Sequence, residues 1–105
     1  MRDNRPISQI YAEEGAKWAE AEAHASILED TKSAFLAQKI AEYGDIAYNR
    51  AEALVKASKE WAARIQETVD ARKQANHRKV RLESIRMAYG EHQSEAANER
   101  VRARL

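Results

Sequence analysis

Residues 58–104, SKEWAARIQETVDARKQANHRKVRLESIRMAYGEHQSEAANERVRAR, contain no proline and a single glycine, Gly90. Ala, Glu, Lys and Arg dominate the stretch, and these residues favour helix. Ser58 suits the N-cap position, with Glu60 in the first turn. The stretch therefore predicts a long helix over 58–104. Gly90 is the point at which this helix could break, and Ser94 could cap a restart.

The first part of the chain predicts a second long helix, over about 8–42, in which only Gly15 weakens the pattern. Ser8 is the expected N-cap, because its hydroxyl can accept a hydrogen bond from a first-turn N–H and Pro6 keeps the preceding backbone extended. Larger and small apolar residues recur every three, four or seven positions and are expected on one face: Tyr11, Trp18, Ala21, Ala25, Leu28 and Phe35.

Residues 43–45 predict the turn between the two long helices. Gly44 can adopt the left-handed conformation that ends a helix, and Asp45 can cap the helix that follows. A short helix is expected over 46–57, with four residues facing inward: Ile46, Ala53, Leu54 and Ala57.

These elements predict an all-α protein, an elongated antiparallel helical hairpin or bundle with two long helices and a short connecting helix. One domain covers residues 1–105. The core is thin, because 21 of the 46 hydrophobic residues are alanine. A chain with so few large apolar side chains gains buried surface by self-association, so we expect a homo-oligomer.

Several classes of protein are not expected. The chain has no cysteine and no glycine-rich phosphate loop, which leaves no basis for thiol chemistry or a nucleotide site. His24, His77 and His92 lack the Glu-x-x-His spacing of a di-metal bundle. We expect no enzyme activity, no cofactor and no metal. No run of about 18 apolar residues is present, and the N-terminal MRDNRPISQI is polar, so we expect a cytoplasmic protein without a membrane span.

The charges are divided between the two halves of the chain. Residues 1–53 carry 6 basic and 10 acidic side chains, whereas residues 54–105 carry 12 basic and 7 acidic ones. A net charge of +1 for the whole chain conceals this asymmetry.

The densest run of positive charge, here called the basic strip, comprises Arg72, Lys73, Arg78, Lys79, Arg81 and Arg86. Two interpretations compete. The six side chains could be solvated or paired with acids of the first helix, with Arg72 or Asn76 as the paired positions. Alternatively, they bind the phosphates of a nucleic acid, which makes binding sensitive to salt. Neutralisation of the strip by neighbouring carboxylates would remove the case for the second interpretation.

Other candidates lie outside the strip. Glu13, Glu14, Glu20 and Glu22 could face a basic groove on a partner protein or form a solvated helix face. Trp18 and Trp61 are expected between the helices, whereas Tyr89 is a candidate for an interface. Arg100, Arg102 and Arg104 suit a helix C-terminus or form a second basic patch.

The second half of the chain resembles a group of small helical proteins of bacterial phages and prophages. The matching positions are Ala71, Arg72, Ala75 and Asn76, followed by Ser94, Ala97, Arg100 and Leu105. The resemblance covers about residues 57–105. It implies a phage or prophage setting, in the cytoplasm of the host bacterium, and carries no catalytic residue.

Three functions remain open. The first is a non-enzymatic accessory protein that binds nucleic acid or a nucleoprotein complex through the basic strip. The second is an inhibitor of a host defence complex, similar to an anti-CRISPR protein, that acts by protein–protein contact. The third is a homo-oligomeric helical scaffold.

Overall fold

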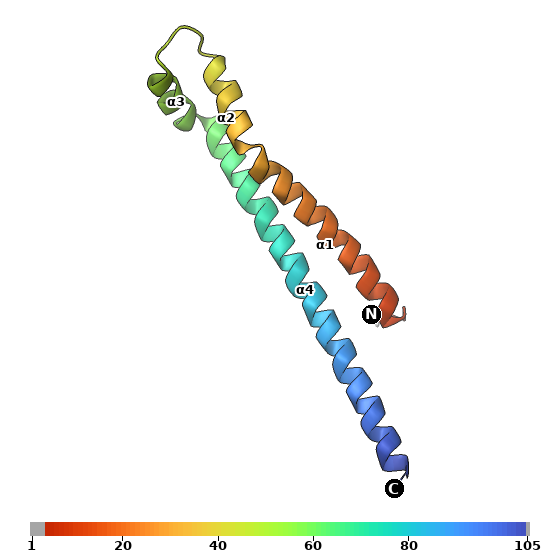
Figure 1. The fold of residues 1–105 in the computed structure, drawn as a ribbon. Coiled ribbons are helices and arrows are strands. Elements are labelled where there is room, and N and C mark those ends of the chain that lie inside the picture. Colours follow the sequence, from red (N-terminus) through yellow and green to blue (C-terminus); the bar gives the residue numbers. More distant parts are fainter. Residues whose placement is uncertain (1–3, 105) are drawn as a thin grey trace.

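The computed structural model describes residues 4–104, which form an elongated, all-helical hairpin (Figure 1). Within that range the helices are α1 (Ile7–Asp30), α2 (Lys32–Ala41), α3 (Tyr48–Lys56) and α4 (Lys59–Arg104). The molecule measures 84 × 24 × 17 Å, with a radius of gyration of 23.3 Å. The expected all-α class and elongated shape are confirmed. Leu105, one of the positions that carry the phage resemblance, lies outside the described residues.

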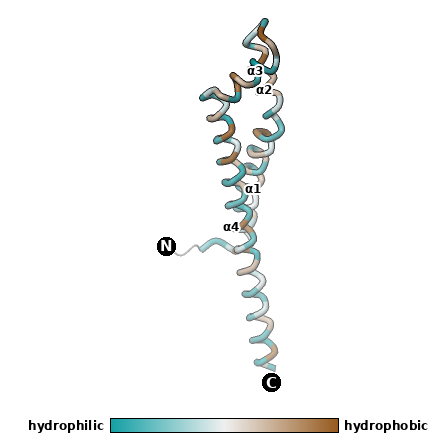
Figure 2. Tube along the Cα trace, turned by 90° about the vertical axis from the view of Figure 1, so that its left-hand side faces the viewer, coloured by the Kyte–Doolittle hydropathy of each residue, from teal (hydrophilic) through white to brown (hydrophobic). Residues whose placement is uncertain are grey.

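The core lies between α1 and α4, which run antiparallel, and it is built mainly from alanine. Ala25 and Leu28 of α1 are buried against Ala71 and Ala75 of α4, with Ala21 packed beside them. Small side chains let the two helix backbones approach closely, but they bury little apolar area. Figure 2 shows the consequence as a mostly hydrophilic trace with thinly spread hydrophobic residues. The thin core expected from composition is confirmed.

The predicted helix over 8–42 is interrupted at Thr31, which separates α1 from α2. The Thr31 hydroxyl donates a hydrogen bond to the Ile27 carbonyl (2.6 Å), and Arg64 of α4 donates one to the Thr31 hydroxyl (2.6 Å). Threonine that bonds back to the preceding turn bends helices. The prediction of one continuous helix was therefore wrong, because a contact with α4 holds the bend in place.

The N-cap of α1 is Pro6 rather than Ser8. The Pro6 carbonyl accepts hydrogen bonds from the N–H groups of Gln9 (3.0 Å) and Ile10 (3.1 Å), so Ser8 lies inside the first turn. Proline locks the extended entry into the helix, and a Ser8 side-chain cap is not formed.

The turn after α2 contains Gly44 at φ +68°, which confirms the left-handed conformation expected there. Asp45 does not cap the next helix, since α3 starts later, with Ala47 as its N-cap. The predicted inward set of Ile46, Ala53, Leu54 and Ala57 was also wrong; all four are exposed.

Ala51 and Val55 are the residues of α3 that are buried instead. These two positions are four residues apart and share a face, whereas Leu54 lies about 80° around the helix from the middle of that face. Because α3 has only 9 residues, an error of one position in assigning its inward face changes the whole set of residues predicted to be buried.

Helix α4 is continuous through Gly90 and Ser94, so neither the break nor the restart occurs. Ser58 starts it as predicted, because its hydroxyl oxygen accepts a hydrogen bond from the Trp61 N–H (3.2 Å). The last part of α4 extends beyond the first turn of α1 and is flanked by no other element (Figure 1). Residues 91–104 of this projecting segment, here called the arm, are exposed apart from Ala96.

Near the closed end of the hairpin, aromatic rings and cations strengthen the packing of α2 on α4. Trp61 stacks on Phe35 with ring centroids 6.2 Å apart, and Arg64 lies 5.1 Å from the Phe35 ring. Lys39 of α2 forms a salt bridge with Glu60 of α4 (2.7 Å). Trp18 and Trp61 are both half-buried, between the helices as expected. No helix within residues 4–104 is long and apolar enough to cross a membrane.

Candidate nucleic-acid interface

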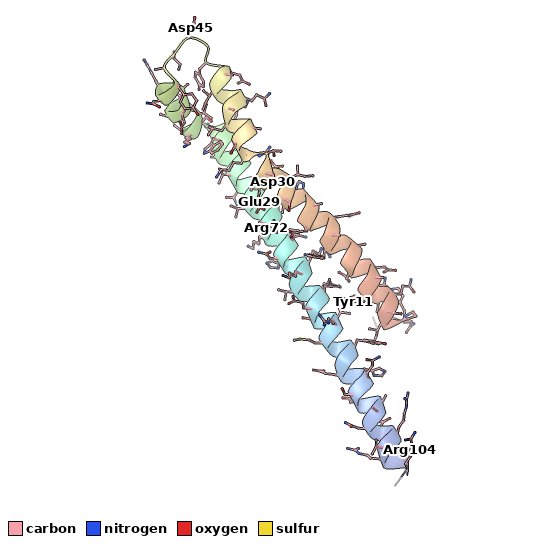
Figure 3. The ribbon with its side chains drawn as sticks, in the orientation of Figure 1. Tyr11, Glu29, Asp30, Asp45, Arg72 and Arg104 are labelled. Atoms are coloured by element: carbon pink, nitrogen blue, oxygen red, sulfur yellow. The ribbon has the colours of Figure 1, made fainter. Side chains whose placement is uncertain are left out.

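Arg72 of the basic strip is held by two carboxylates of α1. Its guanidinium donates hydrogen bonds to both carboxylate oxygens of Glu29 (2.6 and 2.8 Å) and to Glu22 (2.7 Å). Figure 3 shows Arg72 and Glu29 on the facing helices. This arrangement is the internal pairing that the first interpretation of the strip assigned to Arg72.

The pKa values agree with this pairing. Hydrogen bonds from Arg72 lower the pKa of the Glu29 carboxyl below its ordinary value, and hydrogen bonds to Glu29 and then Glu22 raise the pKa of Arg72. Both partners therefore stay charged at neutral pH, and Arg72 is neutralised within the hairpin.

Arg78 and Arg81 are paired with Glu14, the one buried charged residue of the described chain. The Glu14 carboxylate lies 3.3 Å from Arg81 Nε and 3.6 Å from Arg78 Nη1, and Lys17 approaches its other oxygen at 3.5 Å. Arg81 remains largely exposed, with 63% of its side chain accessible, so it is only partly withdrawn from solvent.

The other three cations of the strip are available to a ligand. Within residues 4–104, Lys73, Lys79 and Arg86 take part in no salt bridge, and all three are exposed. The strip thus divides into three internally paired cations and three free ones, and only the free ones support contact with a polyanion.

Arg72, Lys79 and Arg86 are spaced seven residues apart and face one flank of α1. The residues that α1 carries on this flank decide which of the three cations is paired. On α1 the positions seven apart on this flank are Glu29, Glu22, Gly15 and Ser8. Because the helices are antiparallel, Arg72 meets the two glutamates, whereas Arg86 lies at the level of Ser8 and Gly15. On this flank α1 therefore offers a carboxylate to Arg72 but none to Lys79 or Arg86.

Aromatic side chains occupy the same groove as the free cations, although the sequence shows no aromatic residue inside the strip. Tyr11 and Trp18 of α1 line a pocket of about 150 Å³ with four residues of α4, which are Lys79, Leu82, Glu83 and Arg86. Tyr11 and Arg86 also line an adjoining pocket of about 320 Å³, together with Tyr89. We call these two pockets the aromatic–basic groove; Figure 3 labels Tyr11 at this end of the hairpin.

The groove was not predicted from the sequence because it is assembled from two helices. One signal was present: the spacing of three and four that runs through Tyr11, Trp18, Ala21, Ala25 and Leu28 also passes through position 14. That spacing places Glu14 in the contact face, opposite the strip, which could have identified Arg78 and Arg81 as paired.

The acidic residues proposed for a protein partner are mostly engaged inside the chain. Glu14 and Glu22 bind arginines of α4, and Glu13 forms a salt bridge with Arg5 and accepts a hydrogen bond from Gln9. Glu20 is exposed and forms no salt bridge among the described residues. Tyr89 is 42% exposed and belongs to the aromatic–basic groove.

The arm carries the remaining cluster of cations. Arg100, Arg102 and Arg104 are exposed near its end, where Figure 3 labels Arg104. Among residues 4–104 no group of three or more His, Asp or Glu side chains comes together in a way that could hold a metal ion.

No protein-family model, curated protein or solved structure matches this chain. The resemblance to phage and prophage proteins therefore stays a prediction, and the function has to be argued from the groove itself.

Proposed function

We propose that this chain is a non-enzymatic accessory protein, in a phage or prophage setting, that binds nucleic acid or a nucleoprotein complex through the aromatic–basic groove. The observation that carries the proposal is the position of Lys79 and Arg86. Neither cation forms a salt bridge within residues 4–104, although Glu83 also lines the pocket that they share with Tyr11 and Trp18. An exposed cation without a partner is suited to a phosphate, which releases condensed counterions when it is bound.

The rest of the charge distribution supports the same ligand. Lys73 continues the free charge along α4, and Arg100, Arg102 and Arg104 place further cations on the arm. Arg81 stays exposed beside its partner Glu14. Glu91, Glu95 and Glu99 lie between Arg86 and Arg100, so the groove and the end of the arm form two separate positive clusters.

Gly15 offers a sharp test, because a glutamate there would continue the acidic row of Glu22 and Glu29 towards Arg86. A Cβ at Gly15 would lie 4.0 Å from Leu82, an ordinary contact, so the substitution is accommodated. We expect Gly15→Glu to stabilise the hairpin, since glycine is a poor helix former, and to weaken oligonucleotide binding by pairing with the free cations.

The matched control is Gly15→Gln, which has nearly the same shape and helix propensity but no charge. Binding of a labelled oligonucleotide is measured by anisotropy over a series of salt concentrations. We expect the control to bind as the parent does, and Gly15→Glu to show both a lower affinity and a shallower salt dependence. Equal binding by the two variants, or no binding by the parent at low salt, would contradict the proposal.

A homo-oligomeric scaffold is a second candidate, favoured by an apolar row on the side of α4 that faces away from α1. This outer row consists of Val69, Val80, Met87 and Val101, each more than half exposed. Successive members are 11, 7 and 14 residues apart, which keeps them on one stripe of the helix. The occupant we propose is a second copy of the chain.

The charges beside the row fit a parallel pair of α4 helices. In that arrangement Arg86 of one copy lies near Glu91 of the other, the spacing at which coiled coils form interhelical salt bridges. Lys73, Asn76 and Glu83 interrupt the stripe, so we expect a dimer weaker than a continuous coiled coil.

The test is the mass of the particle by light scattering across a range of protein concentrations. We expect a concentration-dependent dimer that Met87→Glu abolishes, because a charge is placed in the row without touching α1. Tyr48→Glu, an equally exposed substitution on α3, is the control. A monomer at every concentration would rule out this candidate.

The third hypothesis, inhibition of a host defence complex through acidic residues, stays a prediction. Three of its four glutamates are occupied by side chains of this chain, so no geometry favours it over the other two candidates.

A further inference from the structure

We infer that the aromatic–basic groove binds single-stranded nucleic acid, with an unpaired base against Tyr11 and Trp18 and its backbone phosphates on Lys79 and Arg86. This inference rests on the proposed function and narrows its ligand from polyanions in general to strands whose bases are exposed. DNA and RNA strands share this chemistry.

The first argument is the composition of the groove. Base stacking on aromatic side chains, combined with a positively charged track, is the general mode of single-strand binding. Tyr11 contributes to both pockets of the groove, and Arg86 does so from the facing helix. A duplex cannot use these rings, since its bases are already stacked and its outer surface presents only phosphates and groove edges.

The second argument is an unsatisfied donor. The indole N–H of Trp18 is buried and has no hydrogen-bond partner within the described chain. A buried donor without an acceptor costs free energy, and such groups are rare in native proteins. Trp18 lines the pocket that holds Lys79 and Arg86, but protein atoms cover its N–H, so a rotation of the indole into this pocket is needed before a base carbonyl can accept the hydrogen bond.

The third argument is accessibility. Tyr11 and Tyr89 are 41% and 42% exposed, whereas the apolar core between α1 and α4 lies further along the seam, around Ala25 and Ala75. The groove can therefore receive a ligand without opening the hairpin. Its larger pocket, about 320 Å³, falls within the size range of small-ligand sites.

The experiment uses Trp18 as its own reporter. In a full-length Trp61→Phe variant, which keeps an aromatic ring against Phe35, Trp18 is the single tryptophan. The variant is titrated with oligothymidylate, with oligouridylate and with a DNA duplex of the same length. We expect both single strands to quench Trp18 fluorescence, and the duplex to bind at least tenfold more weakly.

Tyr11→Leu separates stacking from charge, because it keeps an apolar side chain but removes the ring. We expect it to lower single-strand affinity about tenfold, in line with base–aromatic stacking, and to leave the salt dependence unchanged. Tyr48→Leu, at an exposed tyrosine on α3, is the control and should bind as the parent does.

The outcomes separate this inference from the proposed function. If single strands bind with equal affinity to the duplex, or saturate the protein without changing Trp18 fluorescence, the inference is wrong while nucleic-acid binding stands. If no oligonucleotide binds at low salt, both are wrong. Quenching by one strand type alone identifies DNA or RNA as the ligand and supports the inference.

Discussion

Glu14 is the residue that links stability to ligand binding. It is 4% exposed, lies in the face of α1 that contacts α4, and holds Arg78 and Arg81. A buried carboxylate is costly unless cations compensate it, so this side chain is stable only while both arginines stay close. It stabilises the hairpin at the expense of positive charge that a polyanion could use.

We therefore predict that Glu14→Gln has opposite effects on stability and binding. Loss of the charged partner should destabilise the hairpin by about 1–3 kcal/mol, measured by urea unfolding. The released Arg78 and Arg81 should tighten oligonucleotide binding and steepen its salt dependence.

Glu13→Gln is the control for this prediction, because Glu13 lies on the neighbouring position but pairs with Arg5 and Gln9 rather than with the strip. It should change neither quantity appreciably. If folded Glu14→Gln binds no more tightly than the parent, the released Arg78 and Arg81 do not contact the ligand.

Individual residues were predicted well where local backbone chemistry decides their role. Gly44 adopts the left-handed turn and Ser58 caps α4, since both effects depend on a few neighbours in sequence. Residues whose role depends on the facing helix were harder. Arg72 was assigned to internal pairing only as one of two interpretations, and Glu14 was placed on the surface.

At the scale of the helix, the break between α1 and α2 was missed for the same reason, because it depends on a residue of the facing helix. Nothing near Thr31 requires a bend, because threonine is tolerated inside helices. The bend is held by Arg64, 33 residues away, which donates to the Thr31 hydroxyl and to the Leu28 carbonyl (3.4 Å). A contact of that range cannot be found from periodicity.

The seam between α1 and α4 depends on alanine for its close approach. Ala25 and Ala75 are fully buried and face each other across the core. We predict that Ala75→Leu destabilises the hairpin by about 1–3 kcal/mol, because three additional carbon atoms have to be accommodated between the backbones.

Ala88→Leu provides the comparison, at an exposed position of the same helix. It should change the free energy of urea unfolding by less than about 0.5 kcal/mol. If Ala75→Leu were equally harmless, the two helices would not be packed through their small residues.

Gly90 tests whether α4 is one helix up to its end. A Cβ added there meets no atom within 4 Å, and the backbone is helical. We predict that Gly90→Ala stabilises the arm locally by about 0.5–1 kcal/mol, seen as slower amide hydrogen exchange across residues 88–98.

The contrasting substitution is Gly44→Ala, where φ of +68° disfavours any side chain. We expect it to lower the unfolding free energy by about 1 kcal/mol. If Gly90→Ala leaves amide hydrogen exchange unchanged, α4 is broken near Gly90, contrary to the structure.

For the molecule as a whole, composition and charge predicted more than the helix boundaries did. A thin alanine core and a long helix over 58–104 require an elongated shape, and the hairpin has it, although the helix predicted over 8–42 is divided into α1 and α2. The separation of charge also has a structural role: α1 supplies carboxylates that bind Arg72, Arg78 and Arg81 of α4. Between α2 and α4 the polarity is reversed, because Lys39 binds Glu60. Composition could not predict which cations remain free, because this depends on the register between α1 and α4.

This cross-helix pairing makes the whole hairpin sensitive to acid. Arg72 lowers the pKa of Glu29 below its ordinary value of 4.5, mainly through a hydrogen bond. A group whose pKa is lower in the folded state stabilises the protein above its unfolded pKa, and this contribution is lost as pH falls through the folded value.

We therefore predict that the melting temperature is constant near neutral pH and falls below about pH 4.5, as the Glu29 carboxylate takes up a proton and its pairing with Arg72 is lost. Circular dichroism at a series of pH values measures it. In Glu29→Gln the melting temperature should be lower at neutral pH and should fall less on acidification, since the group whose pKa is shifted is absent. Parallel curves for the two proteins would mean that the pair of Arg72 and Glu29 contributes nothing to holding α1 against α4.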